Sequence, residues 1–266
     1  MDDIIYLPKK NGVIIMGYRN IFRRVETKFI ITEKQKEELM LLFSEYMTED
    51  SYGKSTICNI YYDTPSFLLI RRSLEKPIYK EKLRLRSYGI ADNNSDVFIE
   101  IKKKYRSVVY KRRISAKESD AVKYLESDKK CSDTQVGKEI DYMFELYEGL
   151  SPRVFLSYRR EAFYGKEDPE FRVTFDTDIL WRDHDLSLKA GVYGSRILEE
   201  GKVLLEVKSS GGIPLWLTSY LSESKIYKTS FSKYGNAYLS ILSRNKRMRT
   251  NNNDIKGDIL YASGNF

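Results

Sequence analysis

The stretch that decides the fold of this protein is KLRLR at residues 82–86, where charged and apolar side chains alternate. Alternation with a period of two is typical of a β-strand that has one apolar face and one polar face. The same pattern occurs in FIEIK at 98–102, FRVTFD at 171–176 and LEVK at 205–208. These segments predict a β-rich protein whose strands each present a charged face.

Other segments predict strands from their residue types. Residues 26–31, 56–62, 107–114 and 153–163 are rich in β-branched and aromatic side chains, which favour a pleated sheet. With the alternating segments they make about eight strands.

Helices are predicted between these strands from capping residues and apolar spacing. They are expected from Thr32 to about residue 47, from Ser115 to about 125, at 138–147, after Pro214, and at 232–242. Because strands outnumber helices and show no regular βαβ order, we expect an α+β fold with an antiparallel sheet. A single sheet closed on itself is the natural candidate.

The composition sets broad limits on the protein. Its 266 residues include 46 Lys and Arg against 38 Asp and Glu, a formal net charge of +8, and the pI is near 9.1. This balance fits an anionic partner, although it also serves solubility. The two cysteines, Cys58 and Cys131, lie far apart and predict neither a disulfide nor a zinc site, which fits the cytoplasm.

The domain organisation is expected to be simple. One domain is predicted over residues 1–246, with residues 1–18 weakly anchored to it, and residues 247–266 form a polar C-terminal tail. No apolar run is long enough for a signal peptide or an integral membrane segment.

Several common enzyme motifs are absent from the sequence. There is no GxxxxGK[ST] phosphate loop, no GxGxxG motif after a strand and no HExxH motif, and His184 is the single histidine. A protein of this kind that handles phosphate must therefore use cationic side chains and a metal ion rather than a glycine loop.

The charged strand faces have two interpretations. Arg84 and Arg86 point to the same side of their strand, as do Glu206 and Lys208. For any one strand, the simplest interpretation is a solvated face. If the sheet closes with its helices outside, however, the recurring cations lie in its interior. Their burial then requires a highly charged anion, such as a triphosphate, to compensate their charge.

A series of motifs then resembles a known family, the VTC-type domain of polyphosphate polymerases within the triphosphate tunnel metalloenzymes. The first motif, RVETK at 24–28, looks like the RxExK opening of that domain, and Arg24 stands where the related CYTH phosphatases have glutamate. The following motifs are YYDT at 61–64, KLRLR at 82–86, EIK at 100–102, YRREAF at 158–163, FRVTFD at 171–176, LEVK at 205–208 and SKY at 232–234. The resemblance covers most of residues 23–240.

The resemblance implies a fold and an activity. It implies an eight-stranded antiparallel β-barrel, the triphosphate tunnel, with helices packed outside and at its ends. It implies a metal-dependent phosphotransferase that uses Mn²⁺ or Mg²⁺ to transfer the γ-phosphate of ATP to a growing polyphosphate chain. ATP and polyphosphate are then the expected partners; no nucleic acid is expected, and a membrane partner is left open.

The resemblance also implies roles for individual residues, carried over by motif position. The catalytic candidates are Arg84, Arg86, Arg160, Arg172 and Lys233. The candidates for substrate binding are Lys28, Arg71, Arg72, Lys102, Lys111, Lys208 and Ser232. The candidates for metal binding are Glu206 first, then Glu26 and Glu100, with a salt bridge as the favoured role for Glu100.

Some orientations and two rival functions stay open at this point. The sequence does not resolve which side chains of Arg71 and Arg72 point into the tunnel. The same holds for the basic run 111–113, because consecutive residues of a strand point to opposite faces. Asp176 is expected either to bind metal or to orient Arg172. The rival functions are hydrolysis of tripolyphosphate or nucleoside triphosphates in the same tunnel, and non-enzymatic binding of a polyanion or nucleic acid.

Overall fold

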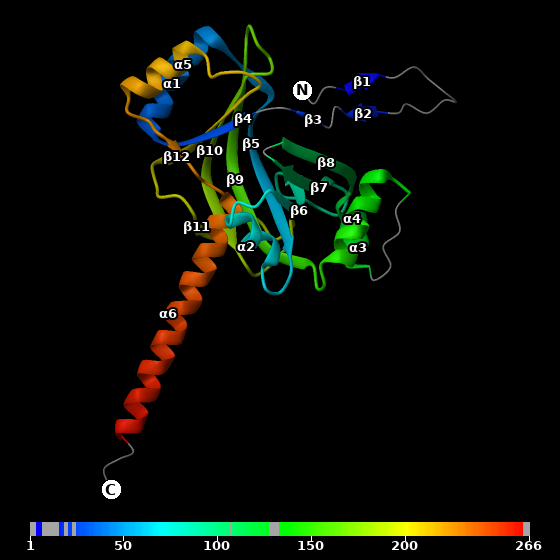
Figure 1. The fold of residues 1–266 in the computed structure, drawn as a ribbon, viewed down its shortest axis with the longest axis vertical. Coiled ribbons are helices and arrows are strands. Elements are labelled where there is room, and N and C mark those ends of the chain that lie inside the picture. The colour runs from blue at the N-terminus through cyan, green and yellow to red at the C-terminus, as the bar shows by residue number, and fades with distance from the viewer. Residues whose placement is uncertain are drawn as a thin grey trace.

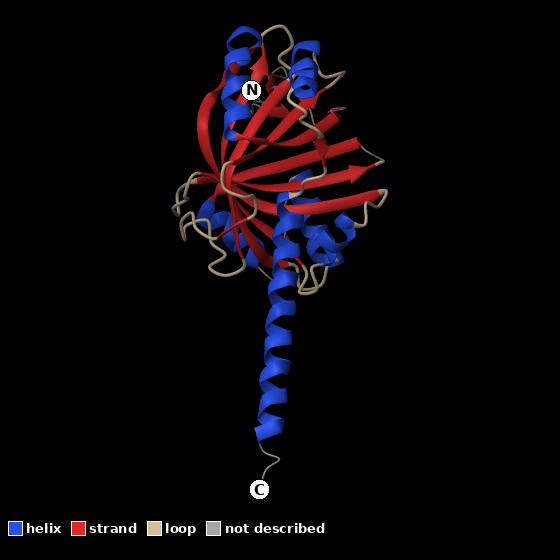
Figure 2. Cartoon of the chain, turned by 90° about the vertical axis from the view of Figure 1, so that its left-hand side faces the viewer, coloured by secondary structure: helices blue, strands red, loops and turns tan. Residues whose placement is uncertain are grey.

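The computed structural model describes residues 4–6, 16–18, 21–22, 25–106, 108–127 and 133–262. Within them the chain forms one 11-stranded sheet of antiparallel strand pairs, with helices packed against it (Figures 1 and 2). The α+β class and the antiparallel sheet expected from the sequence are therefore confirmed.

Eight of the strands in this sheet are long, and each contains a segment that the sequence predicts as a strand. They are β4 (Val25–Thr32), β5 (Met47–Asp63), β6 (Tyr79–Tyr88), β7 (Asp96–Tyr105), β8 (Val108–Lys117), β9 (Ser151–Gly165), β10 (Arg172–Arg182) and β12 (Lys202–Ser209). Three strands of two residues each join them: β3 (Ile21–Phe22), β11 (Ser195–Arg196) and β13 (Lys228–Thr229).

The N-terminal segment forms a small hairpin of its own. Strand β1 (Ile4–Tyr6) pairs with β2 (Met16–Tyr18) in a separate two-stranded sheet. The rest of the segment 1–18, which was expected to be weakly anchored, lies outside the described residues.

The sheet curls, but its hydrogen-bonded order is an open path: β13-β4-β12-β10-β9-β5-β6-β7-β8-β3. The closed eight-stranded barrel is therefore not confirmed. The chain itself nevertheless brings the two ends together, because β3 pairs with β8, β4 pairs with β12, and only residues 23 and 24 separate β3 from β4. The three peptide links from Phe22 to Val25 span at most about 11 Å, so the end of β3 lies within that distance of the start of β4.

The helices fall mostly where the sequence predicts them. They are α1 (Glu33–Tyr46), α2 (Leu68–Leu74), α3 (Glu118–Glu126), α4 (Gln135–Leu146), α5 (Leu215–Glu223) and α6 (Lys233–Ala262). Helix α2 was not predicted, since its seven residues are too few to show a periodic pattern. The polar tail expected at 247–266 is helical up to Ala262, because α6 continues to that residue and projects away from the sheet (Figure 1).

Two groups of helices cover the outer face of the sheet. Helices α1 and α5 bury Leu39, Phe43 and Leu217 against the apolar side chains of β4, β10 and β12, including Phe175 and Leu205. Helices α3 and α4 cover the β6–β8 part with a second apolar cluster (Figure 1). These contacts occupy the apolar face of the alternating strands and leave the charged face to the inside of the curl.

The start of α6 packs on the inner face instead. Tyr234, Ala237 and Ile241 form a third apolar cluster with Leu156 and Leu204, which lie on inward-facing positions of β9 and β12. The first residues of α6 are thereby held beside the charged inner side chains. No helix among the described residues is both long and apolar enough to cross a membrane.

The predicted cap of α1 is present and can be tested. The Thr32 hydroxyl accepts a hydrogen bond from the Gln35 N–H at 3.2 Å, and the Gln35 side chain accepts one from the Thr32 N–H at 2.9 Å. We expect Thr32→Ala to lower the free energy of unfolding by about 1 kcal/mol in urea denaturation, because a helical N–H loses its partner. Thr32→Ser keeps the oxygen and is the control; an equal loss in both variants would contradict this role of the hydroxyl.

Candidate functional site

The strand register places the charged side chains of distant segments on one side of the curled sheet. Lys28 lies opposite Glu206, Asp176 opposite Arg160, Arg84 opposite Glu100, and Lys102 opposite Lys111. Directly opposed residues of antiparallel strands point to the same side. We call this inward-facing surface of β4, β6–β10 and β12 the charged face.

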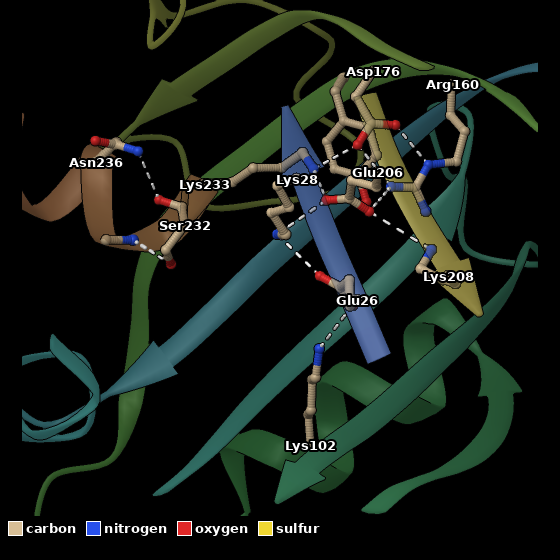
Figure 3. Close-up of polar contacts among 12 residues, drawn as sticks. Glu26, Lys28, Lys102, Arg160, Asp176, Glu206, Lys208, Ser232, Lys233 and Asn236 are labelled. Atoms are coloured by element: carbon tan, nitrogen blue, oxygen red, sulfur yellow. Dashed lines mark hydrogen bonds and ion pairs between the residues drawn. The ribbon is translucent and has the colours of Figure 1, made fainter. Parts of the chain in front are cut away.

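Glu206 is the centre of the first charge cluster on this face. Its carboxylate lies 3.1 Å from Lys28 Nζ, 3.0 Å from Lys233 Nζ, 3.2 Å from an Arg160 nitrogen and 3.6 Å from Lys208 Nζ (Figure 3). Burial alone would raise the pKa of Glu206, but these four cations hold it well below its usual range. The carboxylate is therefore charged throughout the physiological range of pH.

Asp176 joins two members of the same cluster. It accepts two hydrogen bonds from the Arg160 guanidinium, at 2.6 and 2.7 Å, and lies 2.5 Å from Lys233 Nζ. The side chain is fully buried, yet Arg160 and Lys233 lower its pKa against the effect of burial. Of the two roles expected for Asp176, the structure shows a carboxylate that orients cations, and the cations are Arg160 and Lys233.

Glu100 is the centre of a second cluster. Its carboxylate lies 2.6 Å from Arg84, 3.7 Å from Arg86 and 3.0 Å from Lys111, and it is 1% exposed. The salt-bridge role expected for Glu100 is therefore present in the structure. Glu26 connects the far ends of the sheet, because it lies 3.1 Å from Lys28 of its own strand and 3.8 Å from Lys102 of β7.

Aromatic and amide side chains outside the predicted catalytic, substrate-binding and metal-binding sets support these cations. The Tyr158 hydroxyl accepts a hydrogen bond from Arg86 at 3.4 Å, and its ring lies 4.6 Å from Lys233 Nζ and 5.0 Å from the Arg160 guanidinium carbon. Asn59 accepts a hydrogen bond from Arg86 at 2.9 Å. The period-two pattern identifies the inward position of each residue, but it gives no signal for their cationic neighbours.

The structure settles the orientation of the basic run 111–113. Lys111 and Arg113 lie opposite Lys102 and Glu100 and so belong to the charged face. Arg112 points to the other side, where it pairs with Glu139 of α4.

The structure does not bring all predicted residues together. Arg71 and Arg72 are exposed on α2; Arg71 contacts the Ser66 carbonyl oxygen at 3.5 Å, and Arg72 lies near Tyr147. Neither residue has a described contact with the two clusters. Arg172 lies opposite Lys208 and is thus on the charged face, while Arg24 of the opening motif lies outside the described residues.

Ser232 precedes α6 at the edge of the Glu206 cluster. Its hydroxyl accepts a hydrogen bond from the Gly235 N–H at 3.1 Å, and the next residue, Lys233, reaches Glu206 and Asp176 (Figure 3). The start of a helix favours anions, because its first N–H groups have no partner within the helix. The site can therefore bind an anion with side-chain cations and with backbone N–H groups.

The overall charge of the site favours a multivalent anion. Among the described residues, its four carboxylates pair with eight different cations, so positive charge is in excess. A phosphate group suits these surroundings, because a guanidinium group binds two of its oxygens at once and an ammonium group attracts it as a point charge.

Comparison with known proteins places the chain among relatives. A family model described as the VTC domain matches residues 23–242. The chain is 26% identical over 215 residues to "Vacuolar transporter chaperone complex subunit 4" of Schizosaccharomyces pombe, covering 69% of this chain and 30% of that protein. The protein of the same name from Trypanosoma brucei brucei is 27% identical over 163 residues, which cover 50% of this chain and 21% of that protein.

The chain thus spans about a third or less of the length of these curated relatives. Among solved structures, its fold is similar to that of a "putative adenylate cyclase" from Bacillus halodurans, with a TM-score of 0.51 and 14% identity. The match covers 80% of this chain and 95% of the other. At this level of identity the likeness concerns the fold alone.

The charge-compensating role of Asp176 can be tested by comparing its substitution with the same substitution at Asp178, which lies outside the two clusters. We expect Asp176→Asn to lower the free energy of unfolding by about 3 kcal/mol in urea, because Arg160 and Lys233, both partly buried, lose one of the two carboxylates that face them. Asp178→Asn is the control, since Asp178 pairs with the exposed Arg159 and Arg196 and should cost about 0–1 kcal/mol.

Inorganic tripolyphosphate should raise the melting temperature of Asp176→Asn more than that of the unchanged protein, because it replaces the missing charge. Two results would contradict this role of Asp176. One is equal stability of Asp176→Asn and Asp178→Asn; the other is an equal rise in melting temperature with tripolyphosphate for Asp176→Asn and the unchanged protein.

Proposed function

Because the chain belongs to the VTC domain family, we propose that it is a polyphosphate polymerase that transfers the γ-phosphate of ATP to a growing chain of inorganic polyphosphate. The observation that carries the proposal is the charged face itself. Basic side chains from β4, β6, β7, β8, β9, β10 and β12, and from the start of α6, converge there with too few carboxylates to balance them. A linear polyphosphate supplies the missing negative charge in the form of a chain.

We further propose that the substrates lie within the curl of the sheet, as in a tunnel. The Glu26–Lys102 pair joins β4, next to one end of the hydrogen-bonded order, with β7, near the other end. This side-chain bridge supports an enclosed space even though the two ends form no continuous ladder. Enclosure strengthens the attraction between the cations and phosphate by excluding water.

The reaction requires no nucleophile from the protein. A terminal phosphate oxygen of the polyphosphate chain attacks the γ-phosphorus of ATP, the bond to the β–γ bridging oxygen breaks, and ADP leaves. Arg160, Lys233 and Arg84 would hold the phosphates in line and stabilise the charge on the transferred group. The carboxylates Asp176 and Glu100 keep these cations oriented before substrate binds.

The charged face also has donors for a divalent cation. Among the described residues, no three Asp, Glu, His or Cys side chains converge to form a complete metal site. Mg²⁺ is commonly held by one or two carboxylates together with substrate phosphates and waters, and carboxylates suit Mn²⁺ equally. Glu206 is the first candidate and Glu26 the second; both already face cations, four at Glu206 and two at Glu26, so a bound ion would replace part of these contacts. Such an ion would supply further charge neutralisation on the phosphate oxygens.

Two adjacent arginines on opposite faces of β9 provide a test. With ATP and Mn²⁺ or Mg²⁺, we expect the unchanged protein to form long polyphosphate, visible on a gel. Arg160→Met should reduce the rate about 100-fold, the usual effect of losing one group that stabilises transferred charge. Arg159→Met is the matched control and should keep the rate, because Arg159 faces outward and pairs with Asp178.

Arg172→Ala should also reduce polymer formation, and an unchanged rate would remove Arg172 from the site. Release of orthophosphate alone from ATP or tripolyphosphate would contradict polymerisation and support the hydrolase. Equal effects of Arg160→Met and Arg159→Met would contradict the assignment of the charged face.

A further inference from the structure

Asp63, the acidic residue of the YYDT motif at 61–64, is a buried group that the proposed reaction does not use. It ends β5 and is 0% exposed. Its carboxylate accepts hydrogen bonds from the N–H groups of Thr64 at 2.8 Å, Leu69 at 2.9 Å and Ile70 at 3.0 Å. The fourth donor is the Tyr234 hydroxyl of α6, at 2.9 Å. One carboxylate thus joins three elements, β5, α2 and α6, through neutral donors.

The turn between Asp63 and α2 is held in a strained conformation. Phe67, the residue before the helix, has a φ of +57°, in the left-handed region that bulky side chains rarely adopt. Such strain persists only where the surrounding contacts over-determine the backbone. Here the hydrogen bonds of Asp63 fix both sides of the turn, and the Phe67 ring packs on Tyr238 of α6 with ring centres 5.2 Å apart. The turn is therefore a rigid support for α6.

The start of α6 lies directly on this support. A Cβ atom at Gly235 would lie 3.1 Å from the Leu74 Cδ2 atom of α2, so the two helices approach each other closely here. The Tyr234 ring is 2% exposed and stacks on Tyr61 of β5. The hydroxyl that meets Asp63 is thus carried by a ring that is itself held on both sides.

The residue before Tyr234 is Lys233, which the proposed reaction does use. Lys233 Nζ lies 2.5 Å from Asp176 and 3.0 Å from Glu206 (Figure 3). Because the two residues are neighbours in the first turn of one helix, a shift of Tyr234 shifts Lys233 as well. A misplacement of about 1 Å in a group that contacts the reacting atoms can cost about 100-fold in rate.

We infer that Asp63 is a positioning residue for phosphoryl transfer: through the Tyr234 hydroxyl it holds the start of α6 where Lys233 meets the Glu206 cluster. The inference rests on the proposed function, because it assigns a role in that reaction to a residue that acts through another. The carboxylate of Asp63 binds no substrate, and its effect reaches the phosphates only through Lys233.

The hydroxyl can be removed without the ring. Tyr234→Phe keeps the stacking on Tyr61 but loses the hydrogen bond to Asp63. In assays of polymer formation from ATP, we expect kcat to fall about 10-fold, the usual worth of a hydrogen bond to a charged group. The KM for ATP should change less than about 3-fold, because the other cations of the charged face still bind it.

Tyr238→Phe is the matched control. Tyr238 packs in the same apolar cluster one turn further along α6, and within the described residues its hydroxyl forms no hydrogen bond. This variant loses the same atom from the same helix and should keep kcat.

A second comparison separates positioning from a general loss of structure. In a Lys233→Met background, Tyr234→Phe should lower kcat less than about 2-fold, because the side chain that it positions is absent. A merely structural role would give the same effect in both backgrounds. Asp63→Asn should lower kcat at least as much as Tyr234→Phe. Melting temperatures show whether each variant is folded at the assay temperature, and if Asp63→Asn is not, Tyr234→Phe decides alone.

The possible results distinguish failure of this role from failure of the proposed function. If the unchanged protein forms polyphosphate and Tyr234→Phe keeps kcat, or lowers it equally in the Lys233→Met background, the positioning role is overturned and the polymerase stands. If the unchanged protein releases only orthophosphate, the polymerase is overturned. A slower release by Tyr234→Phe, but not by Tyr238→Phe, would still support the role of Asp63. An unchanged protein with neither activity would overturn both proposals.

Discussion

The structure depends on the compensation of positive charge on the inside of a curled sheet. Cations removed from water are costly unless carboxylates or anions face them. Here each carboxylate of the charged face is shared: Glu206 serves four cations and Glu100 three. This sharing keeps the cations oriented and at the same time leaves the face with an excess of positive charge that an incoming polyanion can satisfy.

The outer layers follow from the same alternation that produces the charged face. Most outward-facing residues of the strands are apolar, and helices α1, α3, α4 and α5 bury that side in two separate clusters. The start of α6 is different, because it packs on the inner face through Tyr234 and Ile241. Its position delivers Lys233 to Asp176 and Glu206, so one helix both fills part of the curl and completes the cluster.

Tyr234 shows how the apolar and charged parts of the inner face are joined. Its ring stacks on Tyr61 at 4.5 Å, and its hydroxyl donates a hydrogen bond to the buried Asp63 at 2.9 Å. Asp63 in turn accepts hydrogen bonds from the N–H groups of Leu69 and Ile70 in α2. The start of α6 is therefore fixed to β5 and α2, and the proposed contact of Lys233 with phosphate depends on that anchor.

The sequence by itself determined the strands, the faces of their side chains and the helix cap at Thr32, because period-two alternation and capping are local properties. The ordered motifs likewise identified Lys28, Arg84, Arg86, Arg160 and Glu206 as candidates, all of which lie on the charged face. Only the tertiary structure decided which carboxylate faces which cation, that Arg112 points outward while Lys111 points inward, and that Lys82 meets Ser232. The reason is physical: these contacts join residues 150 positions apart and more, such as Lys82 with Ser232 and Lys28 with Glu206, so they depend on strand order, on register and on the packing of α6 inside the curl.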